Sequence, residues 1–129
     1  MSAGTQHTGK KGEDQACLYL TGLGHSIVAR NWRSSHQETD IISLSQGTLH
    51  FVEVKTRTAP VIADPILNVN AAKRNNMVRS ARAFLNSAER RGLPGDLEIS
   101  FDIITVIFHK DSDRNEIEYY PKAFLPIYV

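Results

Sequence analysis

Two short segments place acidic and basic side chains within otherwise apolar sequence. Glu38 and Asp40 are two residues apart, and Glu53 and Lys55 repeat this spacing thirteen residues after Asp40. Alternate residues of a β-strand share a face, so each pair is expected to point to one side. The surrounding side chains indicate core strands, in which a charged group needs a partner: Ile41, Ile42, Phe51, Val52 and Val54.

If the two strands form a hairpin, the carboxylates and the Lys55 ammonium crowd one spot. Like charges raise each other's pKa unless a cation lies between them. Mg²⁺ would relieve this repulsion, because it takes oxygen ligands and often needs only one or two carboxylates beside substrate phosphate. Such an ion polarises a phosphate and activates water, and a nearby lysine can orient or deprotonate that water. The pattern therefore favours phosphodiester hydrolysis.

A plainer interpretation fits the same residues. Glu53 and Lys55 could form an ordinary ion pair on an exposed strand, and Asp40 could simply begin a strand. A third carboxylate weighs against this interpretation. Glu13 lies three residues before Ala16, on the apolar stripe of an expected helix, where a carboxylate is unfavourable unless a partner inside the fold needs it.

Hydrophobic periodicity predicts a helix over residues 10–23 that ends at Gly22 and Gly24. Three strands are expected next, and residues 45–48 join the last two of them as a hairpin. The expected bounds of these strands are residues 26–33, 38–44 and 49–56.

A long second helix is expected to follow an N-cap at Asp64, to have Pro65 as its first residue, and to end near Arg91. Two further strands are expected at residues 97–108 and 116–120. The order α-β-β-β-α-β-β predicts an α/β fold with a mixed five-stranded sheet flanked by helices. We expect it to form one domain over residues 1–129.

Composition limits the class of protein. The chain has 129 residues, of which 41% are hydrophobic and 22% charged, which is ordinary for one globular domain. We find no apolar run long enough for a membrane span and no signal peptide at the polar N-terminus. Cys17 is the single cysteine, which excludes a disulfide framework within one chain. We therefore expect a cytoplasmic protein without a membrane partner.

The net charge of +1 conceals an uneven distribution of charge. Residues 54–91 carry eight basic and two acidic side chains. Such a positive region is typical of a surface that meets a polyanion, although a solvated helix face explains the charge equally well. Basic residues on the expected long helix include Lys73, Arg74, Arg79 and Arg82.

Several segments stand in a specific order along nearly the whole chain: Gly12-Glu13-Asp14 with Ala16, Arg30–Arg33, Glu38–Ile42, Phe51–Arg57, Val69 with Lys73, Ala81 with Phe84-Leu85, Phe101-Asp102, and Ala123-Phe124. Together they resemble the PD-(D/E)xK nuclease superfamily, whose restriction-endonuclease-like core has the order α-β-β-β-α-β. The resemblance is closer still to the YraN family of bacterial proteins, which look like archaeal Holliday-junction resolvases.

This resemblance implies roles for individual residues. Asp40 and Glu53 would be catalytic ligands of Mg²⁺ or Mn²⁺, helped by the backbone carbonyl of Val54, and Lys55 would be the catalytic lysine. Glu13 would bind a second ion or its water shell. Glu38 is a further acidic candidate, whereas Asp102 is expected to be a structural partner. Contacts with nucleic-acid phosphates are expected from Arg33, Arg57, Lys73, Arg74 and Arg79.

The implied activity is that of a metal-dependent nuclease acting on DNA, with branched DNA as one candidate and a homodimer as one candidate assembly. The sequence departs from the family pattern at Gln37, where a glycine is usual, and at Ser100, where an arginine is usual. The loop at 58–68 also lacks the expected glycine. Two alternatives stay open: a non-catalytic nucleic-acid-binding module on the same fold, and an interaction protein that uses the basic helix face.

Overall fold

The computed structural model describes residues 3–61 and 70–125, with side chains from residue 9 onward. Its helices are α1 (Ala3–Gly22), α2 (Ala71–Leu85) and the short 3₁₀ helix η2 (Ala88–Gly92). Its strands are β1 (Ser26–Ser34), β2 (Gln37–Ser45), β3 (Thr48–Thr58), β4 (Glu98–Phe108) and β5 (Asn115–Tyr120). The expected mixed α/β fold with a five-stranded sheet is confirmed.

The five strands form one sheet in the order β1-β2-β3-β4-β5. All neighbours pair antiparallel except β3 and β4, which run parallel with Glu53 opposite Ile103. A parallel pair requires a crossover, and the chain between β3 and β4 contains α2 and η2. The middle strand of this order is β3, and the neighbouring interior strand β4 is buried at every residue from Ser100 to Val106.

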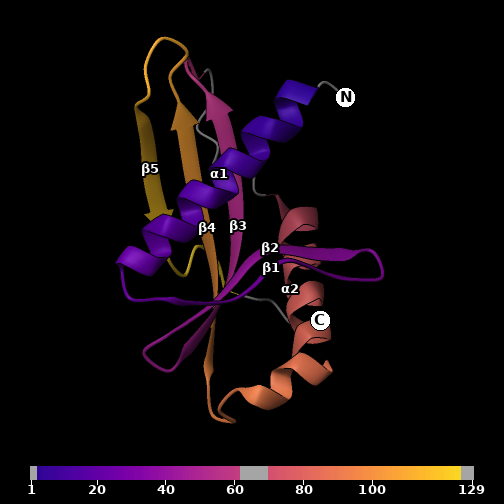
Figure 1. Ribbon diagram of the computed structural model, residues 1–129. Helices are drawn as coiled ribbons and strands as arrows, with labels where there is room; N and C mark the ends of the chain where they lie inside the picture. Colours follow the sequence, from indigo (N-terminus) through magenta and orange to yellow (C-terminus); the bar gives the residue numbers. More distant parts are fainter. Residues whose placement is uncertain (1–2, 62–69, 126–129) are drawn as a thin grey trace.

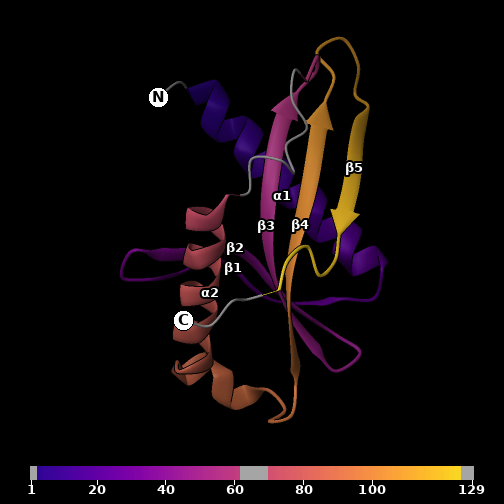
Figure 2. The ribbon, with the colours of Figure 1, turned by 180° about the vertical axis from the view of Figure 1, so that it is seen from behind.

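The helices cover opposite faces of the sheet, as Figures 1 and 2 show: α1 crosses in front of β3–β5 in Figure 1 and behind them in Figure 2. Each helix has its own hydrophobic cluster. On α1, Ala16 and Leu20 pack with Val52 and Ile104. The α2 cluster is built from Met77, Val78, Ala81 and Phe84 together with Ile42, Leu49, Phe51 and Phe101. Each face of β3 is therefore buried by a different helix.

The second helix is shorter than the sequence predicted. It begins after an N-cap at Asn70, whose side chain accepts a hydrogen bond from the Lys73 amide. The expected N-cap at Asp64, followed by Pro65, lies outside the described residues. The prediction that the helix continues to Arg91 was wrong. The Asn86 N–H still makes the helical bond to the Arg82 carbonyl, but the Ser87 N–H and hydroxyl both bind the Phe84 carbonyl, only three residues back, and this closes the helix.

The first helix is longer than expected and begins at Ala3 rather than near residue 10. Its apolar stripe is as predicted at Ala16 and Leu20, which are fully buried. Leu23 lies beyond the helix end and is 52% exposed, so it does not belong to the stripe. No helix among residues 3–61 and 70–125 is long and apolar enough to span a bilayer.

Gly12 allows α1 to approach β3 closely. A Cβ atom at this position would lie 2.0 Å from Thr56 Oγ1 and 3.0 Å from both carbons of that side chain, whereas a Cβ at Gly9 would meet nothing within 4 Å. The close approach sets the height of Glu13, the next residue, above the sheet. Gly12 is therefore needed for packing and not only for helix geometry.

We expect Gly12→Ala to lower the free energy of unfolding by about 1–3 kcal/mol, because the added methyl group overpacks this contact. Gly9→Ala in the same helix should instead raise it by up to about 1 kcal/mol through helix propensity. Urea unfolding of both variants and of Gly12→Ala/Thr56→Ala measures the difference. Equal effects of the two alanines, or no recovery in the double variant, would contradict the steric explanation.

Candidate metal centre

Asp40 lies where β2 separates from β3. The ladder between these strands ends at the pair Ile41 and Val52, and Asp40 is the next residue along β2. Its Oδ2 accepts a hydrogen bond of 2.8 Å from the Val54 N–H, which replaces the missing strand partner. The two strands thus diverge around a carboxylate that is held in the gap by backbone. The hairpin predicted from the sequence therefore brings Asp40 against the Glu53–Lys55 segment.

Glu53 is buried on the face of β3 that α2 covers, with 8% of its surface exposed. One carboxylate oxygen, Oε1, lies 2.8 Å from Lys73 Nζ at the start of α2 and 3.9 Å from Lys55 Nζ. The sequence predicted that Glu53 and Lys55 share a face, which this proximity confirms. Lys73 was expected to contact phosphate, and no short-range pattern connects it with Glu53.

The electrostatics show that the two carboxylates act on each other. Burial, together with the charge of Glu53, raises the pKa of Asp40 to about 7, although the Val54 hydrogen bond opposes this shift. Burial also lowers the pKa of Lys55, and the charges of Lys73 and Arg57 act in the same direction. Asp40 therefore holds its proton more tightly than an exposed aspartate does, and Lys55 gives up its proton more readily than an exposed lysine does.

Glu13 approaches the same region from α1. Its Oε1 is buried and has no hydrogen-bond partner among the described residues, and the nearest cationic atom is Arg30 Nη2 at 4.0 Å. That guanidinium is engaged more closely by Asp14, at 2.8 Å. Burial raises the pKa of Glu13, and its charge in turn contributes to the raised pKa of Asp40. Glu13 is thus within electrostatic range of Asp40, and its assignment to the metal site stays a prediction.

These residues fit a hard divalent cation with few protein ligands. Asp40 and Glu53 offer carboxylate oxygens, and the buried Glu13 Oε1 is a further acceptor without a donor. No three His, Cys, Asp or Glu side chains of the described part of the chain converge closely enough to enclose a metal. Such a partial set suits Mg²⁺ or Mn²⁺, which keep several waters and share their coordination with substrate phosphate.

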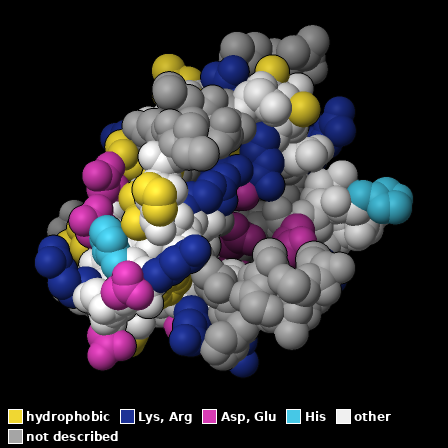
Figure 3. All heavy atoms as spheres, turned by 90° about the horizontal axis from the view of Figure 1, so that it is seen from above, with side chains coloured by type: hydrophobic (Ala, Val, Ile, Leu, Met, Phe, Trp, Pro, Cys, Tyr) yellow, Lys and Arg dark blue, Asp and Glu magenta, His cyan; other side chains and the backbone are white. Residues whose placement is uncertain are grey.

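The other predicted residues lie around this centre to different extents. Glu38 is exposed and pairs with Arg33 across the β1–β2 hairpin at 3.6 Å. The Arg57 guanidinium is partly buried and donates to the Thr56 carbonyl at 2.8 Å. Arg74 and Arg79 are exposed on α2. In Figure 3, dark blue Lys and Arg side chains gather beside magenta Asp and Glu side chains that lie in a recess.

A polar cavity of about 570 Å³ opens beyond the ends of the parallel strands β3 and β4. It is lined by the residue that follows Glu13, Asp14, and by Thr58, which ends β3 three residues after Lys55. Lys11 and Lys110 add two ammonium groups to its wall. The carboxyl ends of parallel strands are a frequent place for ligands, but Asp40, Glu53 and Lys55 are not among the residues that line this cavity.

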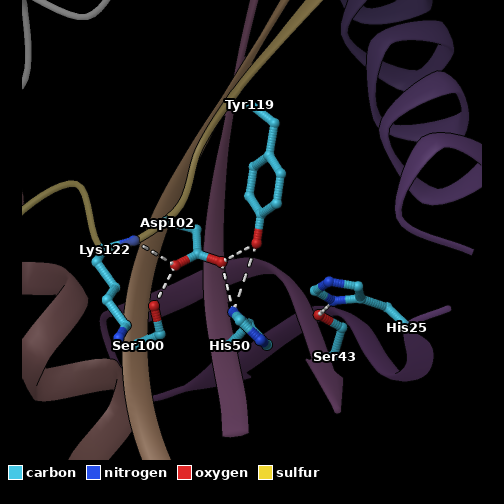
Figure 4. Close-up of polar contacts among 7 residues, drawn as sticks. All are labelled: His25, Ser43, His50, Ser100, Asp102, Tyr119 and Lys122. Carbon is cyan, nitrogen blue, oxygen red and sulfur yellow. Dashed lines mark hydrogen bonds and ion pairs between the residues drawn. The ribbon is translucent and has the colours of Figure 1, made fainter. Parts of the chain in front are cut away.

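A second polar cluster, which the sequence did not predict, lies around Asp102 (Figure 4). Asp102 is fully buried and accepts hydrogen bonds from His50 Nδ1 at 2.6 Å, from Ser100 Oγ at 2.5 Å and from the Tyr119 hydroxyl. The Lys122 amide donates to it at 3.1 Å. The contacts from His50, Tyr119 and Lys122 hold β3, β5 and the C-terminal segment against β4, which matches the expected structural role of Asp102.

The contacts of Asp102 also set its protonation. Burial alone would raise the pKa of this carboxyl group, but hydrogen bonds from His50, Ser100 and Tyr119 outweigh burial and lower it. His25 continues the cluster through a 2.9 Å contact with Ser43 and a ring contact with His50. His50 lies on β3, Asp102 on β4 and Tyr119 on β5, so no spacing within one segment of the sequence marked this cluster.

The model of the family described as "Uncharacterised protein family UPF0102" matches residues 12–106, a range that includes both charged segments and α2. The chain belongs to the UPF0102 family. This finding confirms the expected YraN-like family. The superfamily and the likeness to resolvases stay predictions from the sequence motifs.

Curated relatives in the family extend over most of the chain. A UPF0102 protein of Bacteroides thetaiotaomicron is 38% identical over 118 residues, which cover 92% of both chains. One of Desulforamulus reducens is 34% identical over 124 residues, covering 95% of this chain and 99% of the relative. One of Oleidesulfovibrio alaskensis is 42% identical over 98 residues, or 76% of this chain. That alignment spans 46% of the relative, so the chain covers less than half of its length.

Proposed function

We propose that this UPF0102 protein is a metal-dependent nuclease of the PD-(D/E)xK type with a restriction-endonuclease-like core. The observation that carries the proposal is the pairing of Asp40 with the Glu53–Lys55 segment at the point where β2 and β3 separate. A partly buried carboxylate with a pKa of about 7 beside the buried Glu53 carboxylate is destabilised when ionised, and a divalent cation would relieve this. Sites of this kind are usually functional.

Mg²⁺ or Mn²⁺ would be held by Asp40, Glu53 and the Val54 carbonyl, with Glu13 on the second side of the site. The N–H and carbonyl of a strand residue face the same edge, so the Val54 carbonyl is on the side of Asp40. A divalent ion bound there supplies Lewis-acid polarisation of the phosphate and neutralises charge that develops during the reaction.

The protein's own side chains would carry the remaining steps. Lys55, in its neutral form, would take a proton from the attacking water as the water oxygen bonds to phosphorus and the P–O bond to the leaving nucleotide breaks. Its lowered pKa makes that form more accessible. Arg57 and the exposed arginines of α2 would bind the flanking phosphates, which positions the scissile bond and makes binding salt-dependent.

The proposed substrate is nucleic acid, with DNA favoured and branched DNA as one candidate. The test is a cleavage and binding panel of single-stranded, duplex, flap and four-way-junction DNA and of RNA, with Mg²⁺, Mn²⁺ or a chelator. We expect cleavage of at least one DNA form that stops when the metal is chelated. Salt-dependent binding without cleavage would indicate a non-catalytic module instead, and neither binding nor cleavage would favour an acidic protein partner.

Cation affinity is expected to depend on pH through Asp40. Its pKa of about 7 in the cation-free protein means that the carboxyl group is largely protonated below neutrality, and binding must then displace this proton. Affinity for Mn²⁺ should fall by about tenfold per pH unit below about pH 7 and level off above it. Calorimetric titration with Mn²⁺ measures this. An affinity that is constant from about pH 6 to about pH 8 would contradict the assigned role of Asp40.

A further inference from the structure

Lys73 forms an ion pair with Glu53, one of the carboxylates that the proposed function assigns to the cation. Its Nζ lies 2.8 Å from Glu53 Oε1, whereas Lys55 Nζ lies 3.9 Å from the same oxygen. The backbone of Lys73 is fixed in the first turn of α2 by the Asn70 side chain, which accepts its N–H at 3.0 Å. The capped first turn of α2 therefore positions the Lys73 ammonium group beside Glu53.

An ammonium and a divalent cation compete for one carboxylate oxygen. Mg²⁺ binds oxygen at about 2.0–2.1 Å and carries two positive charges, so a lysine in hydrogen-bond contact with the same oxygen opposes its entry. The Lys73 ammonium group gives the Glu53 carboxylate a cationic partner even when no metal is bound. Asp40 has only the Val54 N–H as a hydrogen-bonded partner, and Glu13 Oε1 has none among the described residues.

Lys73 is also the better placed of the two lysines to leave. Its side chain is 41% exposed, whereas that of Lys55 is 14% exposed. A four-carbon stem lets a lysine ammonium move between partners without a change in the backbone. When the cation binds the Glu53 carboxylate, Lys73 loses that partner. A substrate phosphate that enters beside Glu53 would then give the Lys73 ammonium group a new anionic partner.

Building on the proposed function, we propose that Lys73 is a positioning residue that acts as the internal counter-ion of Glu53 and exchanges it for a substrate phosphate when the divalent cation binds. The exchange makes cation and nucleic-acid binding cooperative. By linkage, the factor by which nucleic acid raises cation affinity equals the factor by which the cation raises nucleic-acid affinity. The free protein would then hold the cation weakly, and hydrolysis would require both partners together.

The test measures Mn²⁺ affinity of the full chain by calorimetry, without and with a short DNA duplex that carries phosphorothioate linkages. The variants are Lys73→Gln, which removes the charge, and Lys73→Arg, which keeps it. Lys122→Gln is the control for net charge, because its exposed side chain lies on the C-terminal segment and only its backbone contacts Asp102. Thermal unfolding of each variant checks that the fold is retained.

We expect Lys73→Gln without DNA to bind Mn²⁺ about tenfold more tightly than the wild type, the order of effect of one neighbouring like charge. Lys73→Arg and Lys122→Gln should remain within about twofold of the wild type. The duplex should raise the Mn²⁺ affinity of the wild type more than that of Lys73→Gln, in which only direct contact between phosphate and cation remains. A merely structural role for Lys73 would weaken Mn²⁺ binding in Lys73→Gln and would not produce this pattern.

Each alternative result is decisive. Unchanged or weaker Mn²⁺ binding by Lys73→Gln, with the wild type binding normally, would overturn the counter-ion role and leave the proposed nuclease centre intact. An equal effect of the duplex on both proteins, or no effect on the wild type, would overturn the exchange with phosphate. Absence of Mn²⁺ binding in every variant would overturn the metal centre itself, and the counter-ion role with it.

Discussion

Replacing Asp40 by Asn is expected to abolish measurable Mn²⁺ binding and to lower metal-dependent cleavage by about 100-fold or more. The amide keeps an oxygen that can accept the Val54 N–H, so the local backbone should be retained. What is lost is the negative charge, which the cation requires. Glu53→Gln should have a similar effect, because Glu53 is the second carboxylate of the pair. Cleavage rates on the most rapidly cut substrate and calorimetric titration measure both losses.

The effect of Asp40→Asn on stability should run opposite to its effect on activity. Burial and the charge of Glu53 hold the Asp40 pKa well above its ordinary value, so the ionised carboxylate destabilises the cation-free fold near neutral pH. We therefore expect an unchanged or higher free energy of unfolding in Asp40→Asn. Asp96→Asn, in an exposed turn, is the matched control and should change neither property. Full cleavage by Asp40→Asn would refute the proposed centre.

The largest effect on stability is expected from Asp102→Ala. This change leaves the buried donors of Ser100, Tyr119 and His50 without their shared acceptor. Removing one partner from a buried network of this kind costs about 3–5 kcal/mol of unfolding free energy. Urea unfolding of Asp102→Ala measures the loss, and Asp111→Asn in the exposed β4–β5 turn is the control. A loss below about 1 kcal/mol would show that the network contributes little.

Asp102 should also make the free energy of unfolding sensitive to acid. Its pKa in the folded protein lies below the ordinary value of 3.8, so the ionised group stabilises the fold. That contribution is complete above the unfolded-state value and is lost as the pH falls through the lower folded-state value. Unfolding free energy of the wild type should therefore decline steeply below about pH 4, and Asp102→Asn should show a shallower decline. Parallel curves for the two proteins would contradict this account.

Much of the fold followed from local patterns because those patterns report burial directly. Ile41, Ile42, Phe51 and Val52 form consecutive apolar pairs, and all four are fully buried in the sheet. The two-residue spacing of Glu53 and Lys55 correctly placed them on one face. Glu13 was singled out because a carboxylate on an apolar stripe is unfavourable. Each of these inferences depended on residues within one turn or one strand.

The remaining features depend on contacts between distant residues. The interruption of the second helix arises at Ser87, whose N–H and hydroxyl both bind the Phe84 carbonyl three residues back, in competition with continuation of the helix. Asp102 meets His50 and Tyr119 only after β3, β4 and β5 are aligned. Lys73 reaches Glu53 because the crossover between β3 and β4 returns α2 to that face. No spacing in the sequence encodes these pairings.

The most direct test of the central claim, that Asp40 and Glu53 hold a divalent cation, is anomalous diffraction from crystals soaked in Mn²⁺. The account predicts one strong anomalous peak in the gap between β2 and β3, about 2.0–2.4 Å from an oxygen of each carboxylate. Lys73 Nζ should lie farther from Glu53 than its present 2.8 Å. A Mn²⁺ peak at another place, or none at concentrations that saturate calorimetric binding, would contradict the account.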